Sequence, residues 1–335
     1  MSQVSFERLT DRGLDAFRTF CLDHWPGEHP LIHNDVMFEY YYRDETDGGI
    51  NFAIACDTET GDIQSVCGYI KSNDGETPDV WISYILTKKG APLNLGFRML
   101  AFIQQITNCR TIACNNIRKK TRGLYEFLGW YVGDQTQYYR LNENISNHTI
   151  CNIVDRKIPT VDSKGYDFTR IDDKKGLEAF DFAAFAENKP YKDRAYFEKR
   201  FFDNPWNEYE VYEARDAGGP VALLVIRQFR HEAAVALRVV EYVGPNEAVA
   251  GFGDFLDRLI KERGADFCDW FAFGLDDGTM LKAGFVPRNG DDPNIIPFYL
   301  SPPSMENVTM SFFTSDKEGY TMFRADGDQD RPNLG

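Results

Sequence analysis

Residues 124–130 read Leu-Tyr-Glu-Phe-Leu-Gly-Trp, and residues 279–285 read Thr-Met-Leu-Lys-Ala-Gly-Phe. Each stretch ends on a glycine followed by an aromatic residue, and the two glycines lie 155 residues apart. Gly96 and Gly251 have the same separation. Because a shared offset at two separate places rarely arises by chance, we interpret the chain as two diverged copies of one α/β unit.

The sequence around these stretches predicts the same order of elements in both copies. Alternating apolar residues predict strands at 51–56, 65–71, 80–86, 111–115 and 131–141, and again at 209–215, 221–227, 233–243 and 267–273. Helical spacing predicts helices at 7–24, 95–106 and 121–128, and again at 175–185, 194–202, 252–263 and 278–283. We therefore expect an α/β (α+β) protein with two tandem domains, each a mixed, mostly antiparallel twisted sheet flanked by helices. A polar connector at 146–165 separates the predicted N-terminal domain, 1–145, from a C-terminal domain with an extension, 166–335.

The composition is that of an ordinary globular protein, with 335 residues, of which 43% are hydrophobic and 27% charged. No run approaches the roughly 20 apolar residues that a membrane span needs, and the first residues lack a basic region followed by an apolar run. A net charge of −15 argues against nucleic acid or an anionic membrane as a partner. The seven cysteines show no metal-ligand spacing, so we expect reduced thiols, no metal and a cytoplasmic protein.

The loop before the helix at 95–106 carries a candidate anion site. Unpaired backbone N–H groups and the positive end of the helix dipole favour an anion at such a helix start. The candidate residues are Lys88, Lys89, Gly90, Asn94, Leu95, Gly96 and Phe97. Alternatively, the two glycines only make a turn and a helix start. In the second copy Glu247 would repel a phosphate, so we predict that the first copy binds the anion.

This order of elements resembles the GNAT superfamily of N-acyltransferases, from the first strand pair of each half to its glycine–aromatic ending. The resemblance implies a strand that diverges from its neighbour, a pantetheine arm in the gap, and a pyrophosphate on the amides of the next helix. The implied acyl donor is acyl-CoA, such as acetyl-CoA, or acyl-ACP. The family pattern is usually a basic residue or Gln, two spacers, Gly, one spacer and Gly or Ala. This chain departs from it, because Gly90 and Gly96 are six residues apart with Pro92 between them.

Tyr125 occupies the position where many GNAT enzymes carry a tyrosine that protonates the departing thiolate. The second copy has Met280 or Leu281 there, and neither side chain can donate a proton. This difference favours a single active site with its donor half in the first copy. The alternative is an amphipathic helix that only buries a tyrosine.

The C-terminal stretch 323–333 reads Phe-Arg-Ala-Asp-Gly-Asp-Gln-Asp-Arg-Pro-Asn. It follows two apolar runs, 307–313 and 319–323, that we predict to be paired strands. The Asp-x-Asp-x-Asp spacing is that of a calcium loop, but the closing Glu is missing. The second half, and this ending most of all, resembles the tandem-GNAT proteins of bacterial O-antigen and capsule sugar pathways. That resemblance implies N-acylation of the amino group of a nucleotide-linked amino-dideoxy sugar.

Such a reaction needs a base for the sugar ammonium and a backbone amide for the carbonyl oxygen. His29 and His33 have a suitable ordinary pKa, and Glu241 lies on a strand among apolar residues. Histidines without a role and a structural ion pair at Glu241 are the alternatives, and the C-terminal carboxylates stay open as bases. The candidate residues for the sugar nucleotide are Trp81, Tyr84, Tyr40, Arg43, Arg118, Asp328, Asp330, Arg331 and Asn333.

The leading hypothesis is an enzyme that moves an acyl group from acyl-CoA or acyl-ACP to a nucleotide-linked amino sugar within a ternary complex. A Fem-like aminoacyl transferase is the second hypothesis, although the net charge and a single dense basic run at 118–122 match tRNA poorly. The third is a catalytically silent GNAT-like binding protein. The exposed strand edges expected of two such sheets favour a homodimer.

Overall fold

One β-sheet runs through both halves of the chain. The computed structural model describes residues 3–161 and 165–332, and in these residues fourteen strands join in the order β1-β2-β3-β4-β5-β13-β6-β11-β10-β9-β8-β7, with β12 beside β6 and β14 beside β11. The first strands are β1 (Val4–Arg8), β2 (Phe52–Asp57), β3 (Ile63–Lys71), β4 (Asp79–Thr87), β5 (Thr111–Cys114) and β6 (Tyr131–Leu141). The later strands are β7 (Asp167–Ile171), β8 (Glu210–Asp216), β9 (Gly219–His231), β10 (Ala234–Val243), β11 (Phe267–Phe273), β12 (Val286–Pro287), β13 (Met310–Thr314) and β14 (Met322–Phe323).

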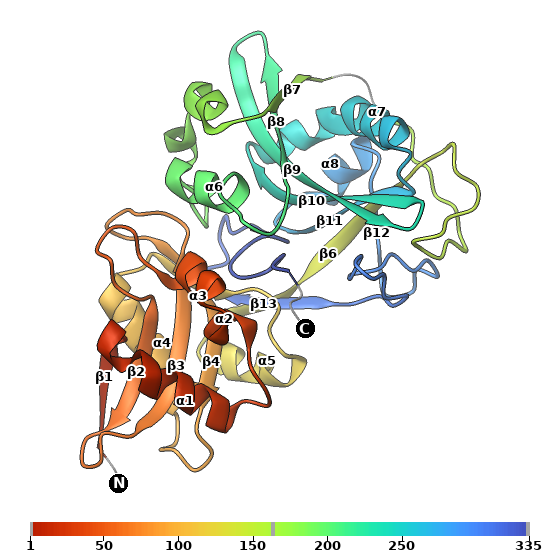
Figure 1. Cartoon of the computed structure of the whole chain (residues 1–335). Helices are drawn as coiled ribbons and strands as arrows, with labels where there is room; N and C mark the ends of the chain where they lie inside the picture. The colour runs from red at the N-terminus through yellow and green to blue at the C-terminus, as the bar shows by residue number, and fades with distance from the viewer. Residues whose placement is uncertain (1–2, 162–164, 333–335) are drawn as a thin grey trace.

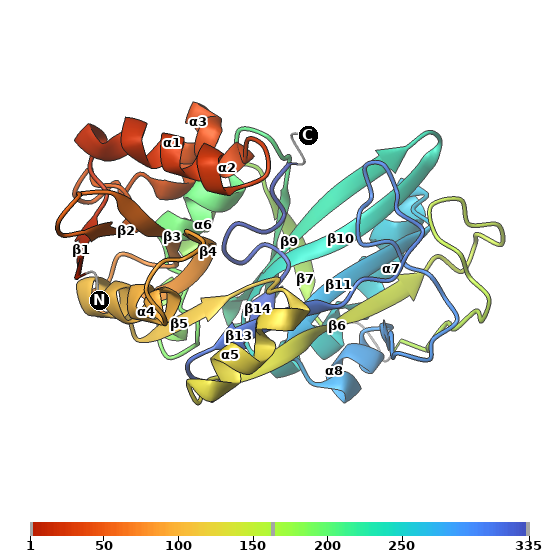
Figure 2. The same ribbon diagram turned by 90° about the horizontal axis from the view of Figure 1, so that it is seen from below.

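Helices cover both faces of this sheet. They are α1 (Leu14–His24), α2 (Pro30–His33), α3 (Asp35–Tyr42), α4 (Leu95–Thr107), α5 (Arg122–Phe127), α6 (Arg194–Phe201), α7 (Gly253–Arg263) and α8 (Asp277–Lys282). In the first half, α1–α3 lie on one side of the sheet and α4 and α5 on the other, and each side has its own apolar core (Figure 2). The predicted α/β fold with a mostly antiparallel sheet is confirmed. Within the described residues, no helix has the length and apolar character to cross a bilayer.

The second half repeats the first, and Figure 1 shows the two halves side by side. In the first half β4 pairs in parallel with β5 and α4 connects them, and in the second half β10 pairs in parallel with β11 and α7 connects them. Gly129 and Gly284 follow α5 and α8 with φ of 77° and 85°. Glycine tolerates this left-handed conformation, which ends a helix. The repeated glycine in the sequence therefore marks the same helix end in both halves.

Two local predictions are wrong. Residues 4–8 form strand β1 against β2, whereas a helix was expected from residue 7. The stretch 175–185 is not one helix but two short 3-10 turns. The side chains of Asp173 and Asp181 each accept hydrogen bonds from the backbone amides that follow them. Each aspartate starts a new turn in this way, so a continuous helix does not form.

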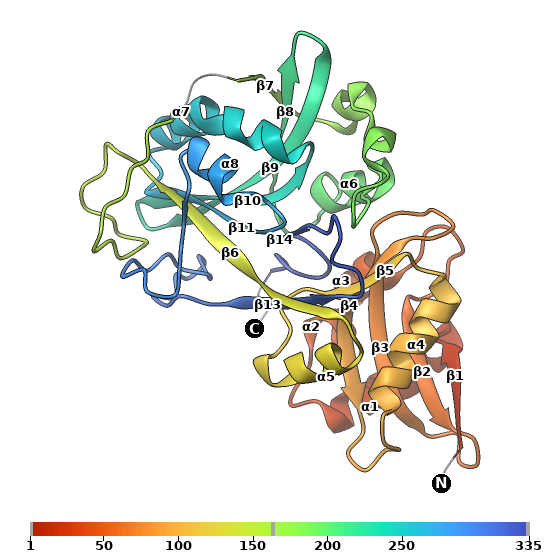
Figure 3. The ribbon, with the colours of Figure 1, turned by 180° about the vertical axis from the view of Figure 1, so that it is seen from behind.

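The two C-terminal runs also form strands, but they do not pair with each other as predicted. β13 inserts between β5 and β6, and β14 pairs with β11. The first residues of β6 pair with β13, and β6 then extends into the second half, where residues 136–141 pair with β11 (Figure 3). The error arises because local pattern shows that a segment is a strand but not which distant strand accepts its hydrogen bonds. The boundaries at 145 and 165 stay predictions.

A buried cation fixes the segment that follows β14, residues 324–332, which we call the C-terminal loop. The Lys192 ammonium lies 2.6 Å from the carboxylates of both Glu241 on β10 and Asp326 in the loop. It also lies 5.0 Å from the centre of the Phe323 ring. All three charged side chains are buried. Burial and the neighbouring Asp326 raise the pKa of Glu241, while the Lys192 ammonium opposes that rise. The ion pair therefore joins the second-half sheet to the loop.

We expect Lys192→Met to destabilise the protein by about 3–5 kcal/mol, because it leaves two buried carboxylates without their cation. The matched control is Lys174→Met, whose exposed ion pair with Asp203 should contribute no more than about 1 kcal/mol. Urea unfolding of both variants at neutral pH gives the comparison. Equal losses in the two variants would contradict an anchoring role for Lys192.

Candidate active site

β4 diverges from β5 at Ser83. In the described chain the two strands pair over three residues each, ending at Trp81 and Ala113, although β4 continues beyond this point. Ser83 is the extra residue of a bulge against β3, because its neighbours Ile82 and Tyr84 pair with adjacent residues of that strand. A bulge bends its strand and increases the local twist. β4 thus turns away from β5, and the two strands pair no further in the described chain; we call this break in the sheet the gap.

The bulge also places the residues beside this break on opposite faces of the sheet, which we call its two walls. Regular alternation would place Ile82 and Tyr84 on the same face of the sheet. Instead, Ile82 packs into the core beneath α4, and Tyr84 packs into the core beneath α1–α3. Ser83 lies between them, with its hydroxyl 3.0 Å from the Tyr42 hydroxyl of α3. One wall therefore belongs to α4 and α5, and the other to α1–α3.

On the wall of α1–α3, three aromatic side chains form a cluster. The centre of the His29 ring lies 5.3 Å from that of Trp25 and 5.1 Å from that of Tyr84. The Arg118 guanidinium lies over the Trp25 ring at 5.5 Å. The His29 Nδ1 is buried and, among the residues described, has no hydrogen-bond partner, whereas the Tyr84 hydroxyl faces the Cys21 thiol. Buried polar atoms normally have partners, so the His29 Nδ1 is the atom of this cluster that a ligand would satisfy.

The C-terminal loop brings charge to His29. Burial and the positive charge of Arg331 together lower the pKa of His29 to about 4, while Asp328 opposes this. Arg331 and Asp328 form an ion pair with each other. At neutral pH the imidazole is therefore uncharged and can accept a proton at Nδ1. The structure thus brings together His29, Tyr84, Asp328 and Arg331, which are far apart in the sequence.

On the opposite wall, Tyr125 of α5 stacks on Phe313 of β13 with ring centres 4.0 Å apart. It belongs to the apolar core beneath α4 and α5. Burial raises the pKa of Tyr125 above its ordinary value, so its hydroxyl stays protonated at neutral pH. A protonated phenol can act as a proton donor but not as a base.

The start of α4 is open. Asn94 adopts a left-handed conformation with φ of 63°, and its side chain forms no capping hydrogen bond. A methyl group added at Gly90 would meet nothing within 4 Å, and one at Gly96 would meet only the Ile85 side chain, at 3.9 Å. Lys88 lies in the loop before this start, together with the exposed Lys89. Leu95 is buried, Phe97 is half-buried, and the amides of this first turn have no side-chain cap. The predicted anion site is therefore accessible.

The equivalent helix start in the second half is covered. A methyl group at Gly251 would lie 2.8 Å from the Tyr166 ring and 3.0 Å from the backbone of Gly165. One at Gly253 would lie 2.1 Å from the Val161 side chain. Residues 246–252 before α7 form a 3-10 helix with Glu247 in its first turn. The second copy therefore lacks room for a phosphate at this position.

Other predicted site residues are buried in structural contacts. Glu241 is engaged by Lys192, which is the ion-pair alternative that the sequence leaves open. Trp81 is buried beneath Gly327 of the C-terminal loop. Asp330 is buried and accepts hydrogen bonds from Tyr209 and Arg227. His33 is half-buried at the end of α2. Asn333 lies outside the described residues.

The three aspartates of the C-terminal loop do not form a cation site. Asp326 pairs with Lys192, Asp328 with Arg331, and Asp330 with Arg227. Each carboxylate is thus directed to a different cationic side chain. Within residues 3–161 and 165–332, no group of three or more His, Cys, Asp or Glu side chains is placed to hold a metal ion.

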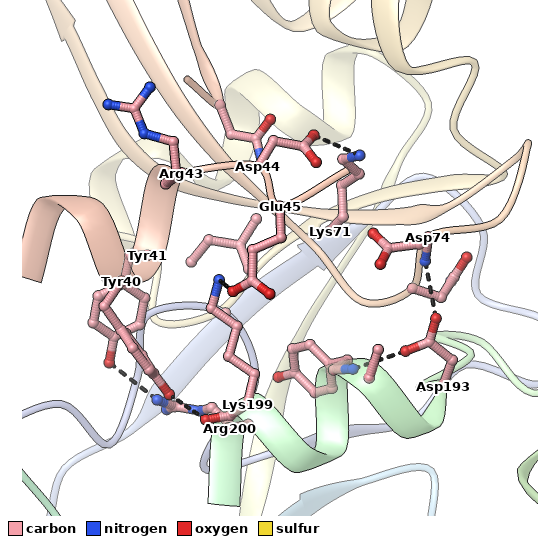
Figure 4. Close-up of a pocket in the computed structure, with 16 residues that line it drawn as sticks. Tyr40, Tyr41, Arg43, Asp44, Glu45, Lys71, Asp74, Asp193, Lys199 and Arg200 are labelled. Atoms are coloured by element: carbon pink, nitrogen blue, oxygen red, sulfur yellow. Dashed lines mark hydrogen bonds and ion pairs between the residues drawn. The ribbon is translucent and has the colours of Figure 1, made fainter. Parts of the chain in front are cut away.

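A pocket lies between α3, β3 and α6, on the face of the sheet that α1–α3 cover (Figure 4). Tyr40, Tyr41, Arg43, Asp74, Asp193 and Arg200 are among its lining residues. Lys71 pairs with Asp44 at 2.7 Å and Lys199 with Glu45 at 2.8 Å, so these charges are already balanced. The pocket therefore suits a polar, uncharged group better than a phosphate.

No protein-family model matches the sequence, and no curated protein matches it. Among solved structures, the chain is similar to a GCN5-related N-acetyltransferase from Anabaena variabilis, with a TM-score of 0.56, 11% identity, and coverage of 93% of this chain and 72% of the other. A GCN5-related N-acetyltransferase from Kribbella flavida is similar with a TM-score of 0.54 and 11% identity, and the match covers 93% of this chain and 71% of the other. A protein from Enterococcus faecalis described as a probable N-acyltransferase is similar with a TM-score of 0.53 and 12% identity, and the match covers 92% of this chain and 72% of the other. The chain has the GNAT fold.

In this GNAT fold, sequence reasoning missed the bulge at Ser83 and the part played by Trp25. The one local signal for the bulge is Gly68 on β3, where a side chain would collide with the Phe52 ring at 2.6 Å. Glycine in a strand interior often marks a bulge or a close approach. The sequence around Trp25 gives no local sign of its role, because Trp25 contacts residues that come from distant parts of the chain.

We expect His29 to make stability depend on pH. Its pKa is about 4 in the folded protein and 6.5 ordinarily. Between these pH values the unfolded chain binds a proton at this histidine that the folded protein does not. The stability that the uncharged His29 contributes is therefore complete above pH 6.5 and is lost as the pH falls through 4. The melting temperature of His29→Gln should therefore fall less than that of the wild type on acidification. The exposed His231→Gln serves as the control and should follow the wild type. If the melting temperatures of all three proteins fell in parallel with pH, the pKa of His29 would not be lowered in the folded protein.

Proposed function

We propose that the protein is an N-acyltransferase that transfers an acyl group from acyl-CoA to the amino group of a nucleotide-linked amino sugar. The observation that carries the proposal is the gap at Ser83, which has the open start of α4 on one side and the uncharged His29 on the other. A donor and an acceptor that bind on opposite walls would meet in this gap. The similar fold of known N-acetyltransferases supports the same chemistry.

The first turn of α4 would hold the pyrophosphate of the donor. Its amides point out of the helix start, and the dipole favours negative charge there. Lys88 and Lys89 add positive charge beside it. When bound, acyl-CoA supplies the thioester carbonyl on which the amine acts. Beyond Trp81, the backbone amides on the edge of β4 that no longer pairs with β5 would donate hydrogen bonds to the carbonyl oxygen.

His29 would take the proton from the acceptor ammonium at Nδ1. Its low pKa makes it a weak base in the free protein, and the charge of Arg331 is one cause of that low value. An anionic acceptor that pairs with Arg331 would remove this effect and raise the basicity of His29. The base would thus be strengthened by binding of the correct substrate.

The decisive experiment incubates the protein with acetyl-CoA and a panel of nucleotide-linked amino sugars while free thiol is measured. We expect Lys89→Glu to raise KM for acetyl-CoA by about ten-fold, because it places negative charge beside the pyrophosphate. The matched control is Glu247→Lys, the reverse change near the covered start of α7, which should leave KM unchanged. Absence of thiol release with every sugar, together with no stabilisation by CoA, would refute the proposal.

We expect Tyr125→Phe to lower kcat by about 10²-fold and leave KM nearly unchanged, because it removes only the proton that the departing sulfur needs. Tyr191→Phe, a half-buried tyrosine outside the gap, is the control. Equal kcat values for Tyr125→Phe and the wild type would show that Tyr125 is only a packing residue.

A further inference from the structure

Arg324, the first residue of the C-terminal loop, is a buried cation whose donors are unused. The residue is 7% exposed. In the described part of the chain, its Nε and Nη1 atoms are buried without any hydrogen-bond partner. The guanidinium lies over the Phe298 ring, 4.6 Å from its centre. A ring face attracts a cation, but it does not satisfy N–H donors.

The carboxylates near Arg324 are already engaged. Asp330 is the opposing charge that acts on Arg324, but its two oxygens accept from Arg227 at 3.0 Å and from Tyr209 at 2.9 Å. Asp269 holds Arg238 through two bonds of 2.8 and 2.7 Å. Burial, together with the positive charges of Arg238 and Arg227, lowers the pKa of Arg324 to about 10. The group thus stays charged at neutral pH, and among the described residues its opposing charge, Asp330, forms no hydrogen bond with it.

Two other buried arginines show what a satisfied guanidinium looks like in this protein. Arg238 uses all three nitrogens, on Asp269 and on the carbonyl groups of Pro297 and Phe298. Arg200 also uses all three, including a bond of 3.0 Å to the Tyr41 hydroxyl. An unpaired buried charge costs several kcal/mol, so natural proteins rarely keep one without a partner. The exception at Arg324 therefore points to a missing anion.

The position of Arg324 agrees with the proposed acceptor side. The C-terminal loop lies between the two halves of the molecule (Figure 2). Asp328 and Arg331 of this loop act on His29, whereas Arg324 contacts Phe298 of the second half. Next to Phe298, the Tyr299 side chain is 49% exposed and is available for stacking.

We propose that Arg324 binds a phosphate of the acceptor, as the diphosphate-recognition residue of the site. The fork of guanidinium donors fits the paired oxygens of a phosphate group. The identification of that phosphate as part of the acceptor rests on the proposed function. The binding of a diphosphate by Arg324 does not depend on the proposed function.

The test compares Arg324→Met, Arg324→Lys and the exposed control Arg230→Met in thermal shift and calorimetry, with inorganic pyrophosphate and with UDP as probes. Arg324→Met removes an unpaired buried charge, so the ligand-free protein should melt at the same or a higher temperature. Its Kd for both probes should rise by about ten-fold or more. Arg324→Lys keeps the charge but not the fork and should bind with intermediate affinity, while Arg230→Met should match the wild type.

Three results would overturn the proposal: no stabilisation of the wild type by either probe, equal affinity of Arg324→Met and wild type, or a lower melting temperature of ligand-free Arg324→Met with unchanged probe binding. The readouts also separate this proposal from the acyltransferase. Probe binding that depends on Arg324, without thiol release from any sugar and without stabilisation by CoA, would keep the anion site and reject the enzyme. Thiol release with an acceptor KM that Arg324→Met leaves unchanged would keep the enzyme and reject the anion site.

Discussion

The Lys192 ammonium holds in one place three segments that are distant in the sequence: the residues before α6, strand β10 and the C-terminal loop. A buried charge pair of this kind is stable only with all its partners present, so the loop has one position rather than several. From that position Asp328 and Arg331 act on His29, Gly327 lies on Trp81, and Arg324 lies on Phe298. The second-half contribution to the candidate site therefore depends on a single ion cluster.

The duplicated fold has become asymmetric through packing as well as charge. Both copies keep the parallel strand pair, the connecting helix and the glycine that ends the next helix. At the start of the connecting helix, however, the first copy is open around Gly90 and Gly96, while Tyr166 and Val161 cover the second. A covered helix start adds buried contacts and cannot admit a phosphate. One copy has thus kept an open helix start, whereas the other buries the equivalent surface in packing contacts.

Much of the fold could be predicted from the sequence, because strand and helix patterns are local and the repeated glycines mark equivalent turns. Partner choice could not be predicted. The run that became β13 is recognisably a strand, yet its partner residues on β5 lie about 200 residues earlier and those on β6 about 180. For the candidate site, Lys88, Lys89 and Tyr125 could be proposed from their positions in the repeated order of strands and helices. The meeting of His29 with Asp328, and the isolation of Arg324, depend on tertiary contacts that no single stretch encodes.

The insertion of β13 also constrains the order of events during synthesis. Strand β5 and the first residues of β6 emerge from the ribosome long before β13 exists, and each then has an edge with free backbone hydrogen-bonding groups. Contacts between residues so distant in sequence form slowly, because a long loop must close first. The sheet of the first half is therefore completed only after residues 310–314 have been synthesised. Until then the edges of β5 and β6 expose backbone groups of the kind that pair with other chains.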